Sequence, residues 1–160
     1  IRPDETESAD AHHMTRPDPN GAGARVAMEA ALAESGVAPS EVDYVNSHGT
    51  GTPFNDAMEA TAIRAALGHS TDPFVVSTKG YVGHTLGAAG ATEAVFVLQS
   101  LVDGWVPASV GAAPLDPEIH LNVPDQVCEA ELRVAMSNSF AFGGSNVSVV
   151  FGSPDFRGAQ

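Results

Sequence analysis

The segment Val42-Asp43-Tyr44-Val45-Asn46-Ser47-His48-Gly49-Thr50-Gly51-Thr52 indicates a short strand followed by a loop of small residues around one histidine. β-branched and aromatic side chains favour the strand over 42–46. A helix is expected next, from Asn55 or Asp56 to about Leu67, with Gly68 as its stop. The same order then recurs, because a strand is expected over 74–77 and a helix over 87–101. Such alternation of strands and helices predicts an α/β layered fold.

The rest of the chain extends this pattern on both sides. Residues 22–35 have a small apolar face and predict a helix, whereas 1–22 are polar and rich in Pro and Gly and are expected to be a loop. The helix over 87–101 is apolar nearly all round, which predicts burial. Strands are expected over 132–137 and 147–151, and their short connection makes them antiparallel. We therefore expect one domain over 23–152, with 153–160 as a tail.

Composition and charge exclude several classes of function. The 160 residues are 43% hydrophobic, and 20 acidic against 7 basic residues give a net charge of −13. Such a chain should be repelled by nucleic acid and by anionic membrane surfaces. Cys128 is the only cysteine, which fits a cytoplasmic location. Ile1 is not a start methionine and no signal peptide follows it, so we expect the chain to be part of a larger product.

Two histidines are the first candidate functional residues. His48 is flanked by glycines and threonines, and His84 follows Gly83 in the loop after the second strand. Glycines allow the backbone to approach a ligand closely. Two imidazoles aimed at one cavity could donate hydrogen bonds to a carbonyl or assist proton transfer. The alternative is that each is an ordinary loop histidine bonded to backbone.

Lys79 and Glu59 are a candidate pair beside these histidines. Lys79 lies in the same loop as His84, and Glu59 lies in the helix after His48. In a closed site a lysine and a glutamate would need mutual charge compensation. The alternative is a solvated loop lysine and a carboxylate on the helix surface.

The run Phe140-Ala141-Phe142-Gly143-Gly144-Ser145-Asn146 is the third feature. Two glycines after an aromatic pair suggest a turn with unusual dihedral angles, whose backbone N–H could contribute to an oxyanion hole. The alternative is an ordinary hairpin with core phenylalanines.

Other chemistry is not supported by the sequence. Cys128 lies among carboxylates, which would make a thiol less reactive, so we interpret it as structural. No HExxH motif or Cys/His spacing indicates a metal, and no glycine-rich phosphate loop is present. No nucleophile accompanies the histidines, so the chain is interpreted as half of an active site.

Taken together, these motifs resemble the C-terminal half of the β-ketoacyl-acyl carrier protein synthases. The matching motifs are His48-Gly49-Thr50-Gly51-Thr52, Lys79 with Gly83-His84-Thr85-Leu86-Gly87-Ala88-Ala89-Gly90, and Asn138-Ser139-Phe140-Ala141-Phe142-Gly143-Gly144-Ser145-Asn146. Residues 10–15 and 20–24 are similar to the elongating, KAS II-like branch, and 53–59 to ketosynthases of polyene-type pathways.

The resemblance implies a thiolase-like fold of two βαβαβ-type halves in five α-β-α-β-α layers, of which this chain would be the second. It implies a decarboxylative Claisen condensation of malonyl thioesters in fatty-acid or polyketide synthesis, with the nucleophilic cysteine in the missing N-terminal half. The substrates would be phosphopantetheine thioesters of acyl carrier protein, without a metal or cofactor. The partners would be the N-terminal half, acyl carrier protein and a second ketosynthase unit, in a homo- or heterodimer.

The resemblance also implies roles for individual residues. His48 and His84 would contact the malonyl carbonyl and stabilise the enolate, and Lys79 would orient the His84 loop and pair with Glu59. Phe142 would be the gating aromatic and would supply an oxyanion N–H, on a loop that Gly143 and Gly144 allow to move. Thr50, Thr52 and Phe140 would line the substrate pocket.

Two other functions stay open at this stage. The first is a non-catalytic, chain-length-factor-like partner subunit of a ketosynthase heterodimer, although both histidines and Lys79 are kept here. The second is a thiolase-type enzyme that uses coenzyme A, which should place a second cysteine in this half. Cys128 does not align with that role.

Overall fold

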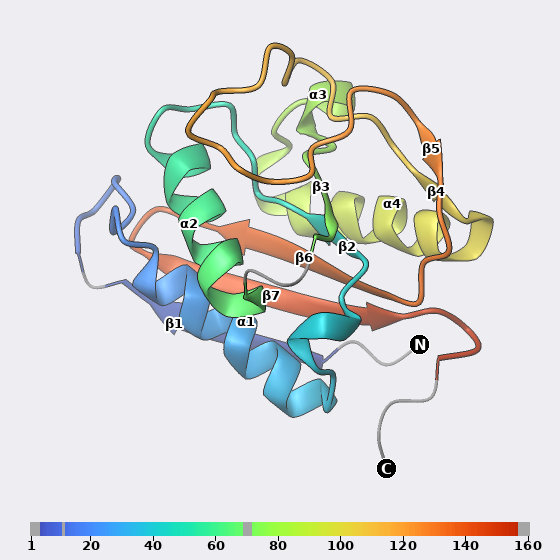
Figure 1. Cartoon of the computed structure of the whole chain (residues 1–160). Coiled ribbons are helices and arrows are strands. Elements are labelled where there is room, and N and C mark those ends of the chain that lie inside the picture. The colour runs from blue at the N-terminus through green and yellow to red at the C-terminus, as the bar shows by residue number, and fades with distance from the viewer. Residues whose placement is uncertain (1–3, 11, 69–71, 157–160) are drawn as a thin grey trace.

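The computed structural model describes residues 4–10, 12–68 and 72–156. Its centre is a five-stranded mixed sheet in the order β1-β7-β6-β2-β3 (Figure 1). The strands are β1 (Asp4–Ala9), β2 (Tyr44–Asn46), β3 (Phe74–Val76), β6 (Val134–Phe140) and β7 (Ser145–Gly152). β2 pairs in parallel with both β3 and β6. β7 is antiparallel to both β6 and β1, which confirms the predicted antiparallel ending.

Helices cover both faces of this sheet. α1 (Ala22–Ser35) and α2 (Asn55–Leu67) lie on one face, and α4 (Ala89–Asp103) lies on the other (Figure 1). α3 (Lys79–Val82), η1 (Pro39–Glu41) and η2 (Leu86–Ala88) are single turns. A separate two-stranded ribbon joins β4 (Trp105–Val106) to β5 (Cys128–Glu129). The α/β layered fold predicted from the sequence is confirmed.

Two apolar cores follow from the alternation of side chains along the strands. Val45 and Met136 face α1 and α2, whereas their strand neighbours Tyr44 and Ala135 face α4. Val45 and Met136 lie opposite each other in the register of β2 and β6. The short central strands therefore need apolar residues on both faces, which explains their high content of Val and Met.

The expected loop over 1–22 is wrong for its first part, because Asp4–Ala9 forms the edge strand β1. Its polar sequence conceals the strand from a hydrophobicity pattern. The hydroxyls of Thr6 and Ser8 donate to the backbone carbonyls of Ala27 and Gly23 in α1, at 2.8 and 2.6 Å. Polar side chains therefore hold this strand against the helix.

Smaller differences concern element ends and one loop. The loop expected over 79–85 begins with the single helical turn α3, and the strand expected over 132–137 runs instead from Val134 to Phe140. The three long helices lie within two residues of the predicted bounds. The region between β4 and β5 is irregular, as predicted for 107–127.

The predicted burial of α4 is met on one side only. Val97 and Leu101 pack against the sheet, but Val95 and Val102 remain 64% and 62% exposed.

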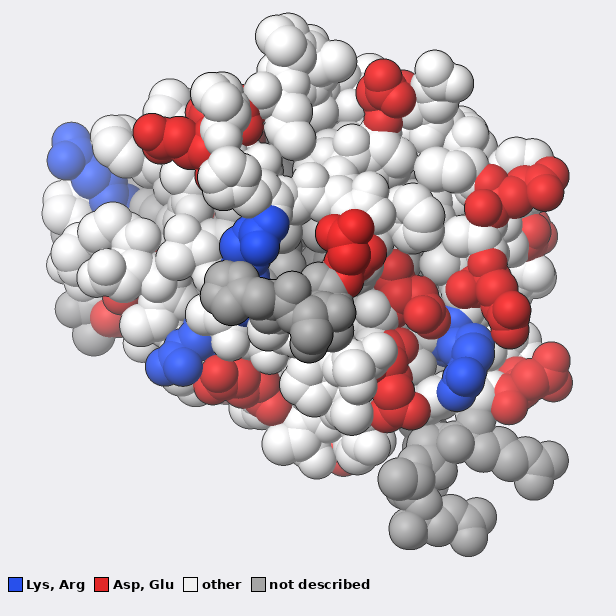
Figure 2. Space-filling model, in the orientation of Figure 1, with Lys and Arg blue, Asp and Glu red and all other residues white. Residues whose placement is uncertain are grey.

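Among the described residues, no helix combines the length and the apolar character needed to cross a bilayer. Acidic side chains outnumber basic ones on the face shown in Figure 2, in line with the net charge.

Candidate active site

The topology brings the predicted site residues to one edge of the sheet. The strands β2, β3 and β6 run in parallel, so their carboxyl ends meet at the same edge. His48 follows β2 by two residues, Lys79 follows β3 by three, and Phe140 is the last residue of β6. Ligand sites of open α/β sheets lie outside such carboxyl ends, so the location fits a site.

The two histidines meet there. The ring centroids of His48 and His84 are 5.4 Å apart, and the planes are nearly perpendicular at 86°. The ring of Phe140 lies 5.6 Å from that of His48 and is tilted by 55° against it. The two imidazoles therefore lie next to each other, but of the two only His84 lines the cavity described below.

His48 is a buried and neutral base. Its exposed fraction is only 7%, and burial lowers the pKa of His48 to about 3, with smaller contributions from the charges of Lys79 and His84. At neutral pH the ring therefore carries one proton and no charge. Its Nδ1 is buried and has no hydrogen-bond partner among the described residues.

His84 differs from His48 in exposure and in its hydrogen bonding. Its side chain is exposed, and its Nδ1 accepts the backbone N–H of Leu86 at 3.3 Å. An imidazole whose Nδ1 accepts a hydrogen bond carries its proton on Nε2, which becomes the donor. Leu86 has a φ of +53°, which is unusual for a residue with a side chain and marks local strain in the turn that holds His84.

Glu59 positions the His48 loop and does not pair with Lys79. Its carboxylate accepts the backbone N–H of His48 at 2.8 Å and that of Gly49 at 2.9 Å. The amide of Asn138 donates at 3.3 Å. Burial raises the pKa of Glu59 to about 7, and these hydrogen bonds oppose that rise. The expected Lys79–Glu59 pair is wrong, because backbone amides already satisfy this carboxylate.

The partner of Lys79 is Glu93 in α4. The Lys79 ammonium and the Glu93 carboxylate form a salt bridge. Their side chains are only 6% and 2% exposed, so the pair is buried. Burial raises the pKa of Glu93, and the Lys79 ammonium opposes that rise. This pair joins α3, which leads to His84, to the helix that follows His84. Lys79 can therefore orient the His84 loop, but through Glu93.

The turn after β6 is shaped by its glycines. Gly143 and Gly144 have φ angles of 87° and 82°. The Gly143 N–H donates to the carbonyl of Met14 at 2.8 Å, and the Gly144 N–H to that of Ala141 at 3.1 Å. Both glycine amides are therefore occupied, and they shape the turn without offering an oxyanion donor. Phe142 is 82% exposed, and no hydrogen bond of its N–H is found among the described residues.

A cavity of about 430 Å³ adjoins the histidine loop. Thr50, Glu59, Lys79 and His84 line it, together with part of α2 and the segment 109–123. The hydroxyls of Thr50 and Thr52 are 3.0 Å apart, but Thr52, Phe140 and Phe142 do not line this cavity. Of the predicted pocket residues, Thr50 lines the cavity, Thr52 is exposed, and Phe140 is half-buried against the apolar core.

The remaining candidates fall outside the site. Cys128 pairs with Val106 in the β4–β5 ribbon and does not line the cavity. Across residues 4–10, 12–68 and 72–156, no group of three or more His, Cys, Asp or Glu side chains could hold a metal.

Sequence reasoning missed two functional contacts, those of Glu93 and Asn138. Glu93 lies in the middle of a mostly apolar helix, and a carboxylate at such a position indicates a buried partner. Asn138 has no comparable signal, because an asparagine in a strand next to a turn is common.

Comparison with known proteins shows the family of this chain. The family model "Beta-ketoacyl synthase, C-terminal domain" matches residues 2–113. The chain is 44% identical over 151 residues to the mitochondrial 3-oxoacyl-[acyl-carrier-protein] synthase of Arabidopsis thaliana, covering 91% of this chain and 33% of that protein. It is 43% identical over 145 residues to 3-oxoacyl-[acyl-carrier-protein] synthase 2 of Coxiella burnetii, covering 89% and 35%.

Solved structures of ketosynthases are also similar to this chain. The ishigamide ketosynthase/chain length factor is similar with a TM-score of 0.88 at 35% identity, over 93% of this chain and 36% of that chain. A type II polyketide ketosynthase in complex with its acyl-carrier protein, AntDE:AntF, has a TM-score of 0.91 at 29% identity, over 94% and 38%. The chain thus spans about a third of the length of the curated relatives it matches.

Proposed function

Because this chain belongs to the β-ketoacyl synthase family, matching its C-terminal domain, we propose that it forms the histidine-bearing half of an active ketosynthase. The activity is the decarboxylative condensation of a malonyl thioester with an acyl-enzyme. The observation that carries the proposal is the meeting of the His48 and His84 rings at 5.4 Å, at the carboxyl edge of the sheet.

The two rings suit a reaction at a thioester carbonyl. His48 is neutral, and His84 is held by Leu86 so that Nε2–H is its free donor. When the malonyl carboxylate leaves as CO₂, the electron pair of the broken C–C bond moves toward the thioester oxygen. The N–H donors of the two rings stabilise the charge that develops on that oxygen. The enolate then attacks the acyl carbonyl and expels a cysteine thiolate, which the N-terminal half supplies.

The other residues support this geometry. Glu59 fixes the backbone of the His48 loop through two N–H groups, and the Lys79–Glu93 pair fixes the approach to His84. Phe142 stands at the rim as the gating aromatic, and its N–H is offered as the oxyanion donor. Thr50 and Thr52 contact the thioester arm. The reaction balances without a metal or a cofactor, and its substrates are the phosphopantetheine thioesters of an acyl carrier protein.

The N-terminal half is proposed to cover α4. Val95 and Val102 face solvent on this helix, and Leu86 is 77% exposed in the turn before it. Apolar groups gathered on one side are typical of a surface that another domain covers. In the assembled enzyme, two such ketosynthase units form a homo- or heterodimer in the cytoplasm, where the single free Cys128 is stable.

The test uses the full-length protein that contains this chain, with an acyl carrier thioester and a malonyl carrier. We expect CO₂ release and a 3-oxoacyl product. His48→Ala and His84→Ala should each reduce CO₂ release at least about 100-fold. If both variants form product at the wild-type rate, the chain is a non-catalytic, chain-length-factor-like partner and the proposal is wrong.

A further inference from the structure

Arg16 is an exposed cation that donates no hydrogen bond to any described residue. Its guanidinium carbon lies 5.4 Å from the centroid of the Phe54 ring. Among the described residues it forms no salt bridge, whereas Arg25 pairs with Glu29 and Lys79 pairs with Glu93. A guanidinium that lies over an aromatic ring contacts the ring through the flat face of the guanidinium. The five N–H donors on its edge therefore stay available for an anion.

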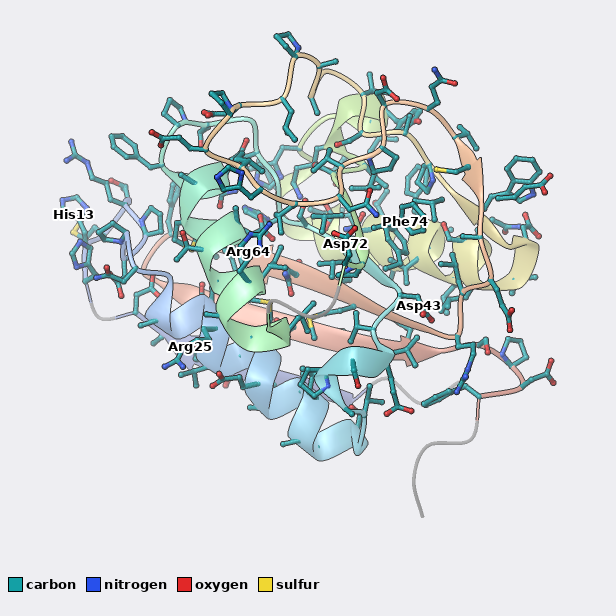
Figure 3. All side chains as sticks on the ribbon, in the orientation of Figure 1. His13, Arg25, Asp43, Arg64, Asp72 and Phe74 are labelled. Carbon is teal, nitrogen blue, oxygen red and sulfur yellow. The ribbon has the colours of Figure 1, made fainter. Side chains whose placement is uncertain are left out.

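The Arg16–Phe54 contact joins two segments that lead to residues of the candidate site. Phe54 follows the His48 loop, two residues after Thr52. The loop that carries Arg16 is bonded to the gating turn, because the Met14 carbonyl accepts the Gly143 N–H at 2.8 Å. The contact therefore bridges the two segments that hold Phe142 and the threonines. Figure 3 shows His13 of the same loop at an outer edge of the molecule.

The ring contact also reduces the cost of binding. A free arginine side chain loses rotamer entropy when it grips a ligand, whereas one already held on a ring loses less. Phe54 is 63% exposed, so the contact is not a core interaction. Its exposure leaves the ring face accessible to the Arg16 guanidinium.

Arg16 is a local positive charge on a strongly acidic chain. The net charge of −13 repels anions in general. At physiological ionic strength the screening length is about 8 Å, so distant carboxylates count less than a guanidinium in direct contact. An anionic group in direct contact with Arg16 is therefore attracted by its guanidinium more strongly than it is repelled by carboxylates beyond that length.

We infer that Arg16, held on Phe54, binds the phosphate of the phosphopantetheine arm as its thioester enters the site. This inference rests on the proposed function, since that function supplies a phosphopantetheine substrate. The same phosphate occurs in carrier-linked phosphopantetheine and in coenzyme A. A guanidinium matches a phosphate with two parallel N–H···O bonds. Arg16 would thus be a specificity residue that distinguishes phosphorylated from unphosphorylated arms.

The experiment measures the equilibrium binding of phosphopantetheine and of pantetheine, which lacks the phosphate, to the full-length protein by calorimetry. The wild type should bind phosphopantetheine about 10-fold more tightly, the size expected for a charge-assisted hydrogen bond. Arg16→Met should reduce this preference to less than about 3-fold and leave pantetheine binding unchanged. Phe54→Leu should give an intermediate preference.

Arg25→Met is the matched control, because it removes the same charge from an exposed site on α1 (Figure 3). It should keep the wild-type preference. The inference is overturned if the wild type binds both compounds equally, if Arg16→Met weakens both equally, or if Arg25→Met has the same effect as Arg16→Met.

A second measurement distinguishes the carrier-linked phosphate from that of coenzyme A. It also distinguishes the proposed ketosynthase function from the proposed Arg16 site. The KM of each variant is compared for malonyl carrier and malonyl coenzyme A. A rise for Arg16→Met with the carrier alone identifies the carrier arm, and a rise with both identifies the shared phosphate. If condensation is absent but phosphate-dependent binding persists, the proposed function fails and the Arg16 site stands. If condensation occurs without that preference, only the Arg16 site fails.

Discussion

Replacing Glu59 by Gln should change how the stability of the protein depends on pH. Glu59 is buried and its pKa is about 7, against an ordinary value of 4.5. Between these values the folded protein holds a proton that the unfolded chain has released. A raised folded pKa therefore contributes stability below about 4.5 that is lost as the pH rises through about 7.

The magnitude follows from the two pKa values. Each pH unit across the window is worth at most about 1.4 kcal/mol, which gives about 3 kcal/mol for Glu59 over the whole window. His48 acts in the opposite sense, because its pKa is about 3 in the folded protein against 6.5 ordinarily. Its contribution is present above 6.5 and is lost as the pH falls through 3. From about pH 4.5 to 6.5 the two slopes cancel.

Glu59→Gln should therefore expose the His48 slope. Relative to the wild type, the variant should gain stability with rising pH, by up to about 1.4 kcal/mol per unit between pH 4.5 and 7. Glutamine can accept only one of the two N–H groups of the loop, so a constant loss of about 1–3 kcal/mol is expected as well. That loss does not vary with pH and leaves the slope readable.

The assay is urea unfolding of the full-length wild type and the variant across this pH range. Glu29→Gln, an exposed carboxylate on α1, is the control and should show no comparable trend. The reasoning is refuted if the difference in the free energy of unfolding between Glu59→Gln and the wild type is flat or falls with rising pH.

Three further predictions concern stability. Glu93→Ala should lower the free energy of unfolding by about 3–5 kcal/mol, because it leaves Lys79 buried without a counter-charge. Adding Lys79→Met to that variant should recover much of the loss, as measured by urea unfolding. Equal losses in the single and the double variant would contradict a coupled pair. Gly144→Ala should cost about 1–3 kcal/mol in thermal unfolding, because φ is +82° and a Cβ would lie 2.9 Å from that of Asp10, whereas Gly87→Ala, with open space around it, should not. The isolated chain should aggregate or bind a hydrophobic dye through the exposed side of α4, and a sharp cooperative melt would argue against this.

Much of the fold could be predicted because local patterns and packing agree in it. The central strands and the three long helices have strong periodicity and glycine stops, and the sheet buries both faces of the strands as their composition requires. β1 could not be found in this way. Its residues are polar, and hydroxyl bonds to α1 and pairing with β7 hold it in place. These contacts join parts of the chain far apart in sequence.

The site could be predicted as a set of residues but not as a set of pairs. The glycine-rich frames mark His48 and His84, and spacing suggests Glu59 as the carboxylate for Lys79. Both Glu59 and Glu93 could have been the partner of Lys79, and the sequence does not show which of them faces the lysine. The fold decides, because Glu59 of α2 binds the backbone of the His48 loop, whereas Glu93 of α4 reaches Lys79 in α3.

The exposure of the two histidines connects assembly to chemistry. His48 is buried by this chain alone, whereas His84 is exposed in the segment that leads into the uncovered helix α4. Hydrogen bonds and charges act more strongly where water is excluded. A domain that covers α4 and Leu86 would also exclude water from His84, and it would bring the missing nucleophile to the same place. If the proposed N-terminal half covers α4, the same covering domain accounts both for the exposed apolar side of α4 and for the exposure of His84 in this chain.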